Sequence, residues 1–322
     1  MRPFSHVGFL VLLLGVAPLC SSESVAEGSF ERTLAVSGAV DLDVNTGAGS
    51  IQVRRGDSVT VRVVGTVRVR RLSRSEADEK VRSITSNPPV EQNGNSIRIG
   101  RLEERGGREN NVSISYEIYA PSETRLRART GSGSQSVEGI RGPAEVSTGS
   151  GSVKVHNITE TVRASTGSGS IEIEDVAADA RCETGSGGIV AHRVGRDFRA
   201  TTGSGNVRLD GASGAVEIGT GSGSVEADAV RGSLRAHTGS GDITAGGEPT
   251  GEWKLDAGSG SIKVRLPAQA AFDLDARGSG GITVDHPLTV RGKVSRDELS
   301  GSVRGGGVLV RAHTGSGRIH IQ

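Results

Sequence analysis

Residues 166–183 read TGSGSIEIEDVAADARCE, and Thr184 opens the next copy of the same pattern. The tetrapeptide Thr-Gly-Ser-Gly recurs every 18 residues, six times in succession. Self-similarity at a fixed period is typical of repeat architectures, in which each unit stacks on its neighbours. The regular copies begin at Thr130, Thr148, Thr166, Thr184, Thr202, Thr220 and Thr238, with variants at Ala257 and Arg277 and an intact copy at Thr314.

Each unit contains two short runs in which apolar and polar residues alternate. Counting the Thr as position 1, apolar residues stand at positions 6 and 8, as in Ile171 and Ile173, and at positions 15 and 17, as in Phe198 and Ala200. Alternation at period two indicates a half-buried strand. A unit of two strands cannot bury its apolar face alone, so the sequence predicts an all-β, single-chain β-solenoid of 18-residue rungs.

The corners of this solenoid follow from the same pattern. Glycine suits tight corners because it accepts backbone conformations closed to other residues. The Thr at position 1 continues the inward alternation, and its hydroxyl is expected to bond its copies in the rungs above and below. Outward position 7 places opposite charges on neighbouring rungs, as in Lys154 and Glu172. Between Arg277 and Thr314 we expect two rungs, the second degraded around Ser300–Ser302.

The first 26 residues are predicted to be a signal peptide. Val7 to Ala17 form an apolar run too short to span a bilayer but typical of a secretory leader, and small residues follow it. Cys20 offers a lipoprotein anchor as a less favoured alternative, because Leu19 before it is not small. We therefore expect export to the periplasm, the cell surface or the medium, with no membrane-spanning segment in the mature chain.

Residues 27–129 are predicted to form an irregular β-rich cap ahead of the regular repeats at 130–322. Ser73–Glu76 resembles a capping box that opens a helix reaching about Ser83, and Pro88-Pro89 prevents its continuation. A related motif, Thr46–Ser50, lies outside the regular array. At the other end, Arg318–Gln322 stops within a strand, which predicts an unpaired last rung and end-to-end self-association.

The Thr-Gly-Ser-Gly units, the Thr46–Ile51 segment and the Asn87–Pro89 stretch together resemble a family of bacterial β-strand-repeat domains of unknown function that carries the label putative adhesin. The resemblance covers about residues 40–322, and the repeated motif is its specific part. It implies an exported β-solenoid with a surface or envelope role, and it supplies no catalytic residues.

Composition narrows the classes of function. The chain has 8 aromatic residues in 322, which argues against an aromatic-lined ligand pocket. Its 38 basic and 37 acidic residues nearly cancel, so no overall field attracts nucleic acid. The Gly-Ser-Gly loops lead into strands, unlike phosphate cradles, which lead into helices. We expect no cofactor, no Ser/His/Asp catalytic set and no enzymatic activity.

Position 9 carries the one candidate site. Side chains there would face outward about 4.8 Å apart, close enough to bind a divalent metal or to pair a general acid with a base. The alternative is a solvated stripe in which His relieves repulsion between acids. The stripe consists of Glu138, His156, Glu174, His192, Asp210 and Asp228.

Four further residues could suggest chemistry but are expected to be core residues or solvent-exposed side chains. Cys182 at position 17 is expected to be a buried, unreactive thiol. Trp253 should fill the core in a rung that is one residue longer than the others. His237 and His313 precede corner threonines and should face the solvent.

The sequence thus favours an exported, non-enzymatic adhesin or envelope-binding protein whose partner is a surface glycan or an envelope protein. A self-assembling periplasmic scaffold is the second hypothesis. A polysaccharide-acting or metal-binding protein that uses the position 9 stripe is the third.

Overall fold

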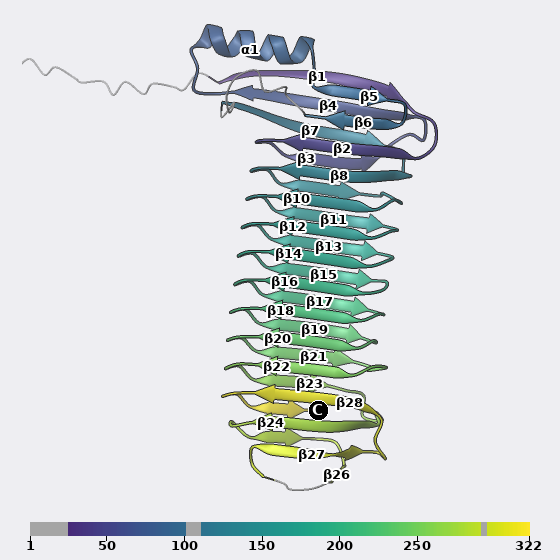
Figure 1. Cartoon of the computed structure of the whole chain (residues 1–322), viewed down its shortest axis with the longest axis vertical. Coiled ribbons are helices and arrows are strands. Elements are labelled where there is room, and N and C mark those ends of the chain that lie inside the picture. Colours follow the sequence, from purple (N-terminus) through teal and green to yellow (C-terminus); the bar gives the residue numbers. More distant parts are fainter. Residues whose placement is uncertain (1–24, 101–110, 291–294) are drawn as a thin grey trace, which may run out of the picture.

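The computed structural model describes residues 25–100, 111–290 and 295–322. Over these ranges the chain is mostly β-structure with one short helix, and its strands form two long, largely parallel sheets of 14 and 15 strands, consistent with a β-solenoid. Figure 1 shows the strands stacked into a rod that carries the helix at one end. The expected leader falls outside the described ranges except for Val25 and Ala26, and so does Cys20.

The strand order in each sheet gives the order of the rungs. The first sheet runs β1 (Ala26–Ala35), β4 (Thr60–Val69), β7 (Val112–Ala120), β3 (Ile51–Arg55), β9 (Gln135–Glu138), β11 (Val153–Ile158), β13 (Ile171–Val176), β15 (Ile189–Val194), β17 (Val207–Ala212), β19 (Val225–Val230), β21 (Ile243–Gly247), β23 (Ile262–Arg265), β29 (Ile319–Ile321), β25 (Ile282–Val284). The second runs β26 (Leu288–Val290), β27 (Glu298–Val303), β24 (Phe272–Gly278), β28 (Val308–Thr314), β22 (Trp253–Ala257), β20 (Leu234–Thr238), β18 (Val216–Thr220), β16 (Phe198–Thr202), β14 (Ala180–Thr184), β12 (Val162–Thr166), β10 (Ala144–Thr148), β8 (Thr124–Thr130), β2 (Val40–Thr46), β6 (Ser96–Ile99), β5 (Val90–Asn93).

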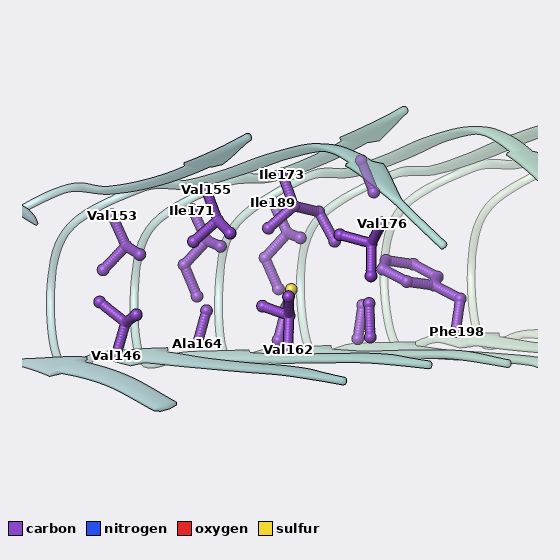
Figure 2. Packing of buried hydrophobic residues seen from close by; sticks show 14 of the residues in the cluster. Val146, Val153, Val155, Val162, Ala164, Ile171, Ile173, Val176, Ile189 and Phe198 are labelled. Carbon is purple, nitrogen blue, oxygen red and sulfur yellow. The ribbon is translucent and has the colours of Figure 1, made fainter. Parts of the chain in front are cut away.

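Like positions of neighbouring rungs pair directly. In the first sheet Val153 pairs with Ile171, and Ile171 pairs with Ile189. The inward residues of both sheets meet in one narrow core, where Figure 2 shows Val146 and Ala164 facing side chains from the opposite sheet. Branched aliphatic side chains suit such a thin core because they pack closely on a pleated surface.

The corner threonines point into the rod, but their hydroxyls do not join one another as expected. Thr148 Oγ1 donates to the carbonyl oxygen of Gly133 in the preceding rung at 2.9 Å and accepts the backbone N–H of Gly151 at 3.1 Å. Corner backbone groups have no strand partner and must be satisfied when buried, so they take the hydroxyl instead. The same two bonds recur at Thr166, Thr184, Thr202, Thr220, Thr238 and Thr314.

Helix α1 (Arg74–Ser86) covers one end of the rod, against β1 and β4. The predicted capping box is present at Ser73 and Glu76, and the helix runs three residues beyond the predicted Ser83 before Pro88. Below this end, β2 and β3 stack directly on the repeats, because Thr46 pairs with Thr130. The Thr46 motif, which the chain separates from the array, therefore belongs to the stack in space.

The opposite end departs from the predicted order. β28 lies between β22 and β24, and β29 lies between β23 and β25. The expectation of an unpaired last rung at Arg318–Gln322 is therefore wrong, because β29 has a strand partner on each side. The expected degraded rung around Ser300–Ser302 is also wrong, since β27 runs antiparallel to both β24 and β26.

Candidate functional site

The position 9 residues form a continuous outward column on the first sheet, as predicted. Successive members of the stripe are paired across neighbouring strands from β9 to β19. They are exposed or half-buried, so all six side chains reach the solvent. The column is Glu138, His156, Glu174, His192, Asp210 and Asp228.

The centre of the stripe already has a cationic partner. His156 Nδ1 lies 3.3 Å from Glu174 Oε2, and Arg193 donates to Glu174 at 2.6 Å. Arg193 also donates to Asp175 at 2.5 and 3.0 Å. These hydrogen bonds hold the pKa of both carboxyls below their usual range and raise the pKa of Arg193. The two carboxylates are therefore ionised and bound to a guanidinium at neutral pH.

The metal-binding hypothesis depends on this cluster. Ligand atoms of His156, Glu174 and Asp175 lie within 4.8 Å of one another, the one such group of three found among the described residues. A carboxylate and imidazole set suits a divalent metal such as zinc. Arg193 occupies both carboxylates, so a metal would have to displace it. Further along, His192 Nδ1 lies 3.6 Å from Asp210, and Asp228 accepts from Arg265 at 2.7 Å.

Asp175 was not predicted as a site residue because the backbone at position 10 does not follow the regular strand alternation. This position has a left-handed conformation in six consecutive rungs, with φ between 53° and 89°. The bend turns the Asp175 side chain toward Glu174 and Arg193 instead of continuing the strand alternation. The Gly and Asn residues in the column were a signal for it. The column is Gly139, Asn157, Asp175, Arg193, Gly211 and Ala229.

The four residues that were expected to have structural roles or to face the solvent lie largely as predicted. Cys182 is fully buried, and burial raises the pKa of its thiol to about 12. Trp253 is buried, and its Nε1 donates to the Gly232 carbonyl oxygen at 3.0 Å. His237 is exposed, whereas His313 is half-buried, 3.7 Å from Asp256 and 3.9 Å from Asp275. The insertion of β28 between β22 and β24 brings these acids around His313.

The second sheet carries a feature that the sequence reasoning missed. Position 16 gives Arg163, Arg181 and Arg199 on three neighbouring strands in direct register. Glu217 follows them, and then Arg235 pairs with Lys254. The signal for this column in the sequence is the recurrence of a basic residue at position 16 of successive rungs. We call Arg163, Arg181, Arg199, Arg235 and Lys254 the basic ladder.

The basic ladder lines a groove of about 550 Å³ that follows the rod across β12 to β22. Its lining also includes the buried position 15 residues, such as Phe198, and residues just before each strand, such as Asp179 and Asp197. Because every rung contributes the same positions, the groove runs along the stack.

The family model described as Toastrack DUF4097 matches residues 40–322. The chain belongs to this Toastrack family. The resemblance seen in the repeat motif is therefore confirmed, and the matched segment of the Toastrack chain contains both the stripe and the basic ladder.

Two solved structures are similar to the Toastrack chain. A putative cell adhesion protein from Clostridium sporogenes is 13% identical, with a TM-score of 0.23, over 91% of this chain and 99% of that one. A putative adhesin from Bacteroides fragilis is 12% identical, with a TM-score of 0.34, over 92% of this chain and 97% of that one. No curated protein matches the sequence. Among the described residues, no helix combines the length and apolar character needed to span a membrane.

Proposed function

We propose that this Toastrack protein is an exported, non-enzymatic adhesin that binds a surface glycan or an envelope protein along the faces of its rod. The observation that carries the proposal is the register of the outward positions: each face presents the same side-chain positions rung after rung. Contacts that are weak individually can add up to firm attachment when many are made at once. A stiff rod suits this role because it loses little conformational freedom on binding.

The repeat and the leader support the finer parts of the proposal. We take the 18-residue unit as the rung of the solenoid, since Val153, Ile171 and Ile189 are successive partners. The apolar run at residues 7–17 supports export by a signal peptide that is then removed. Export places the protein in the periplasm, at the cell surface or in the medium.

The pairing of the acidic stripe supports a non-enzymatic role. A general acid or base needs a side chain whose pKa lies near the working pH. The pKa of Glu174 is lowered instead, by its hydrogen bond from Arg193. Arg265 likewise binds Asp228. These acids are arranged as members of surface ion pairs.

Protease shaving of intact source cells tests the proposal. Antibodies against the repeats should lose their signal after protease treatment while a periplasmic marker stays intact, and beads coated with the full chain should adhere to a surface that the source cell colonises. Protection of the repeats until the envelope is opened would contradict surface adhesion and favour the periplasmic scaffold.

A further inference from the structure

The two faces of the rod carry different charge, although the whole chain is nearly neutral. Over β11 to β21 of the first sheet, positions 7 and 9 carry five acids against Lys154 and Arg208. Over the facing strands β12 to β22, positions 16 and 18 carry the five cations of the basic ladder against Glu183, Glu217 and Asp256. These outward positions of the second sheet thus carry two more cations than acids, and the groove beside them is also lined by Asp179, Asp197 and Glu252.

The basic ladder is an arrangement that stability alone does not favour. Like charges directly opposite on neighbouring strands destabilise a sheet, and neighbouring strands lie only about 4.8 Å apart. Arg181 is paired with Glu183 and Arg199 with Glu217, each at 2.6 Å. Arg163 and Arg235 have no ion pair with any residue in the described part of the chain. Two guanidinium groups in the groove are thus available to an external anion.

The acids that line the groove beside the ladder already have partners. Glu252 forms an ion pair with Arg311 at 3.1 Å, and Asp179 and Asp197 accept backbone hydrogen bonds. Asp197 Oδ1 accepts the backbone N–H of Ala215 at 2.8 Å, and Asp179 Oδ1 accepts that of Asp197 at 3.3 Å. Both carboxylates therefore satisfy backbone groups of the following rung. The cations, in contrast, extend outward from the strands with exposed or half-buried side chains.

We propose that the basic ladder binds a linear, carboxylated polysaccharide that lies along the rod axis. This inference rests on the adhesin function proposed above and specifies its ligand. The planar guanidinium matches a carboxylate in two parallel hydrogen bonds, so arginine suits this partner better than lysine would. Cations repeated along an open groove fit a polymer with a repeated charge. Single-stranded nucleic acid fits less well, because Phe198 is the sole aromatic among the lining residues and it is buried.

The probe is polygalacturonate, and its fully methyl-esterified form is the uncharged control. The full chain should bind polygalacturonate, lose affinity as salt increases, and show no comparable binding to the ester. Arg163→Gln combined with Arg235→Gln removes the two unpaired cations without breaking an ion pair, and should weaken binding about tenfold. Arg55→Gln combined with Lys263→Gln removes equal charge from strands of the first sheet, and should leave binding unchanged. Thermal unfolding of each variant verifies its fold.

Several outcomes would overturn the proposal. It is wrong if the ester binds as well as the acid, if the ladder variant binds like the unmodified chain, or if the control variant loses as much affinity. Tighter binding of duplex DNA, competing at equal charge concentration, would assign the groove to nucleic acid instead. Because these measurements use purified protein, they are independent of the shaving experiment. Surface exposure without polygalacturonate binding would leave adhesion standing and remove only this ligand.

Discussion

The Thr202 hydroxyl donates a hydrogen bond to the carbonyl oxygen of Gly187, 15 residues earlier in the chain, at 2.9 Å. The same hydroxyl accepts the backbone N–H of Gly205 at 3.1 Å. One side chain thus links the corners of two rungs. The same two corners are also joined by a backbone hydrogen bond from the Gly203 N–H to the Gly185 carbonyl oxygen at 3.0 Å.

Replacing Thr202 by Val should therefore lower the free energy of unfolding by about 1–3 kcal/mol, since it leaves two buried backbone groups without their partner. Thr202→Ser keeps the hydroxyl and should cost less. Urea unfolding followed by circular dichroism measures the difference. Thr201→Val changes the neighbouring exposed side chain and serves as the control. Equal costs at 201 and 202 would show that the corner bonds add nothing to stability.

Two glycines in the same region should respond oppositely to substitution. A Cβ on Gly205 would lie 1.8 Å from the Gly187 carbonyl oxygen, so Gly205→Ala should destabilise the protein by about 3 kcal/mol or prevent stacking there. A Cβ on Gly219 would meet nothing within 4 Å, so Gly219→Ala should be neutral or stabilising by about 0.5 kcal/mol. Midpoints of thermal unfolding distinguish the two. Similar loss in both variants would contradict the close-approach explanation.

The left-handed backbone conformation at position 10 predicts that a substitution at Ala229 can stabilise the protein. Its φ is 53°, a conformation that costs a residue with a Cβ about 1–2 kcal/mol and glycine much less. Ala229→Gly should raise the free energy of unfolding by about 0.5–1 kcal/mol after the entropic cost of glycine in the unfolded chain. Ala227→Gly, at a buried strand position two residues earlier, should destabilise. A loss at both positions would argue against backbone strain at position 10.

Cys182 should make stability depend on pH in the alkaline range. Burial raises its pKa to about 12 in the folded protein, whereas the thiol of the unfolded chain ionises near its usual value of about 8.5. The unfolded state then binds fewer protons above about pH 9, so stability should fall by roughly 1.4 kcal/mol per pH unit from there toward pH 12. Cys182→Ala should lose the part of this slope that the thiol contributes and keep the part from Tyr116, whose pKa is also raised by burial. Alanine fits the site because the paired residues Ala164 and Ala200 are small.

The same thiol offers a chemical readout. A thiol reagent at neutral pH should leave the folded chain unmodified and react fully in denaturant, because the folded protein excludes the thiolate. Rapid modification of the native protein would show that the thiol is accessible, and the alkaline slope should then be missing as well.

Zinc should bind better when Arg193 is removed. Arg193→Gly frees Glu174 and Asp175 beside His156, and glycine accepts the φ of 54° at this position. Calorimetry should show zinc affinity increased about tenfold or more over the unmodified chain, since three ligands become available to the metal. His156→Ala in the same background should abolish the gain. Equal zinc binding with and without Arg193 would contradict its role as the competing cation.

The sequence predicted the interior of the rod well because one period controls it. Strand alternation places Ile171 and Phe198 inside, and the local capping rule locates the helix at Ser73. The hydroxyl partners of Thr148 could not be predicted, because the pattern does not show which corner groups lack a strand partner. Asp175 was not predicted for a related reason. Strand alternation predicts that the position 9 side chains face outward, whereas the direction of the Asp175 side chain depends on a left-handed backbone conformation.

The order of the rungs at the C-terminal end of the rod could not be predicted from the sequence. Residues of β28 repeat the same inward pattern as any other rung, with Val310 and Ala312 buried, so they fit equally well at several levels of the stack. The pairing of Thr46 with Thr130 was hidden in the same way, because the chain leaves the stack between them to build the cap. A periodic pattern predicts how rungs pack on one another, and it leaves open which rung neighbours which.

The place of β28 and β29 also limits how the protein can be made. Both follow β24 and β25 along the chain, yet they lie between those strands and β22 and β23 in the stack. A chain that leaves the ribosome or a translocation pore in order can add the regular rungs from β9 to β23 one by one. From there, β24 and β25 have no permanent partner on the stack until β28 and β29 are available, because β28 and β29 are the strands that join them to β22 and β23. Assembly at this end therefore cannot finish until residue 321 has emerged.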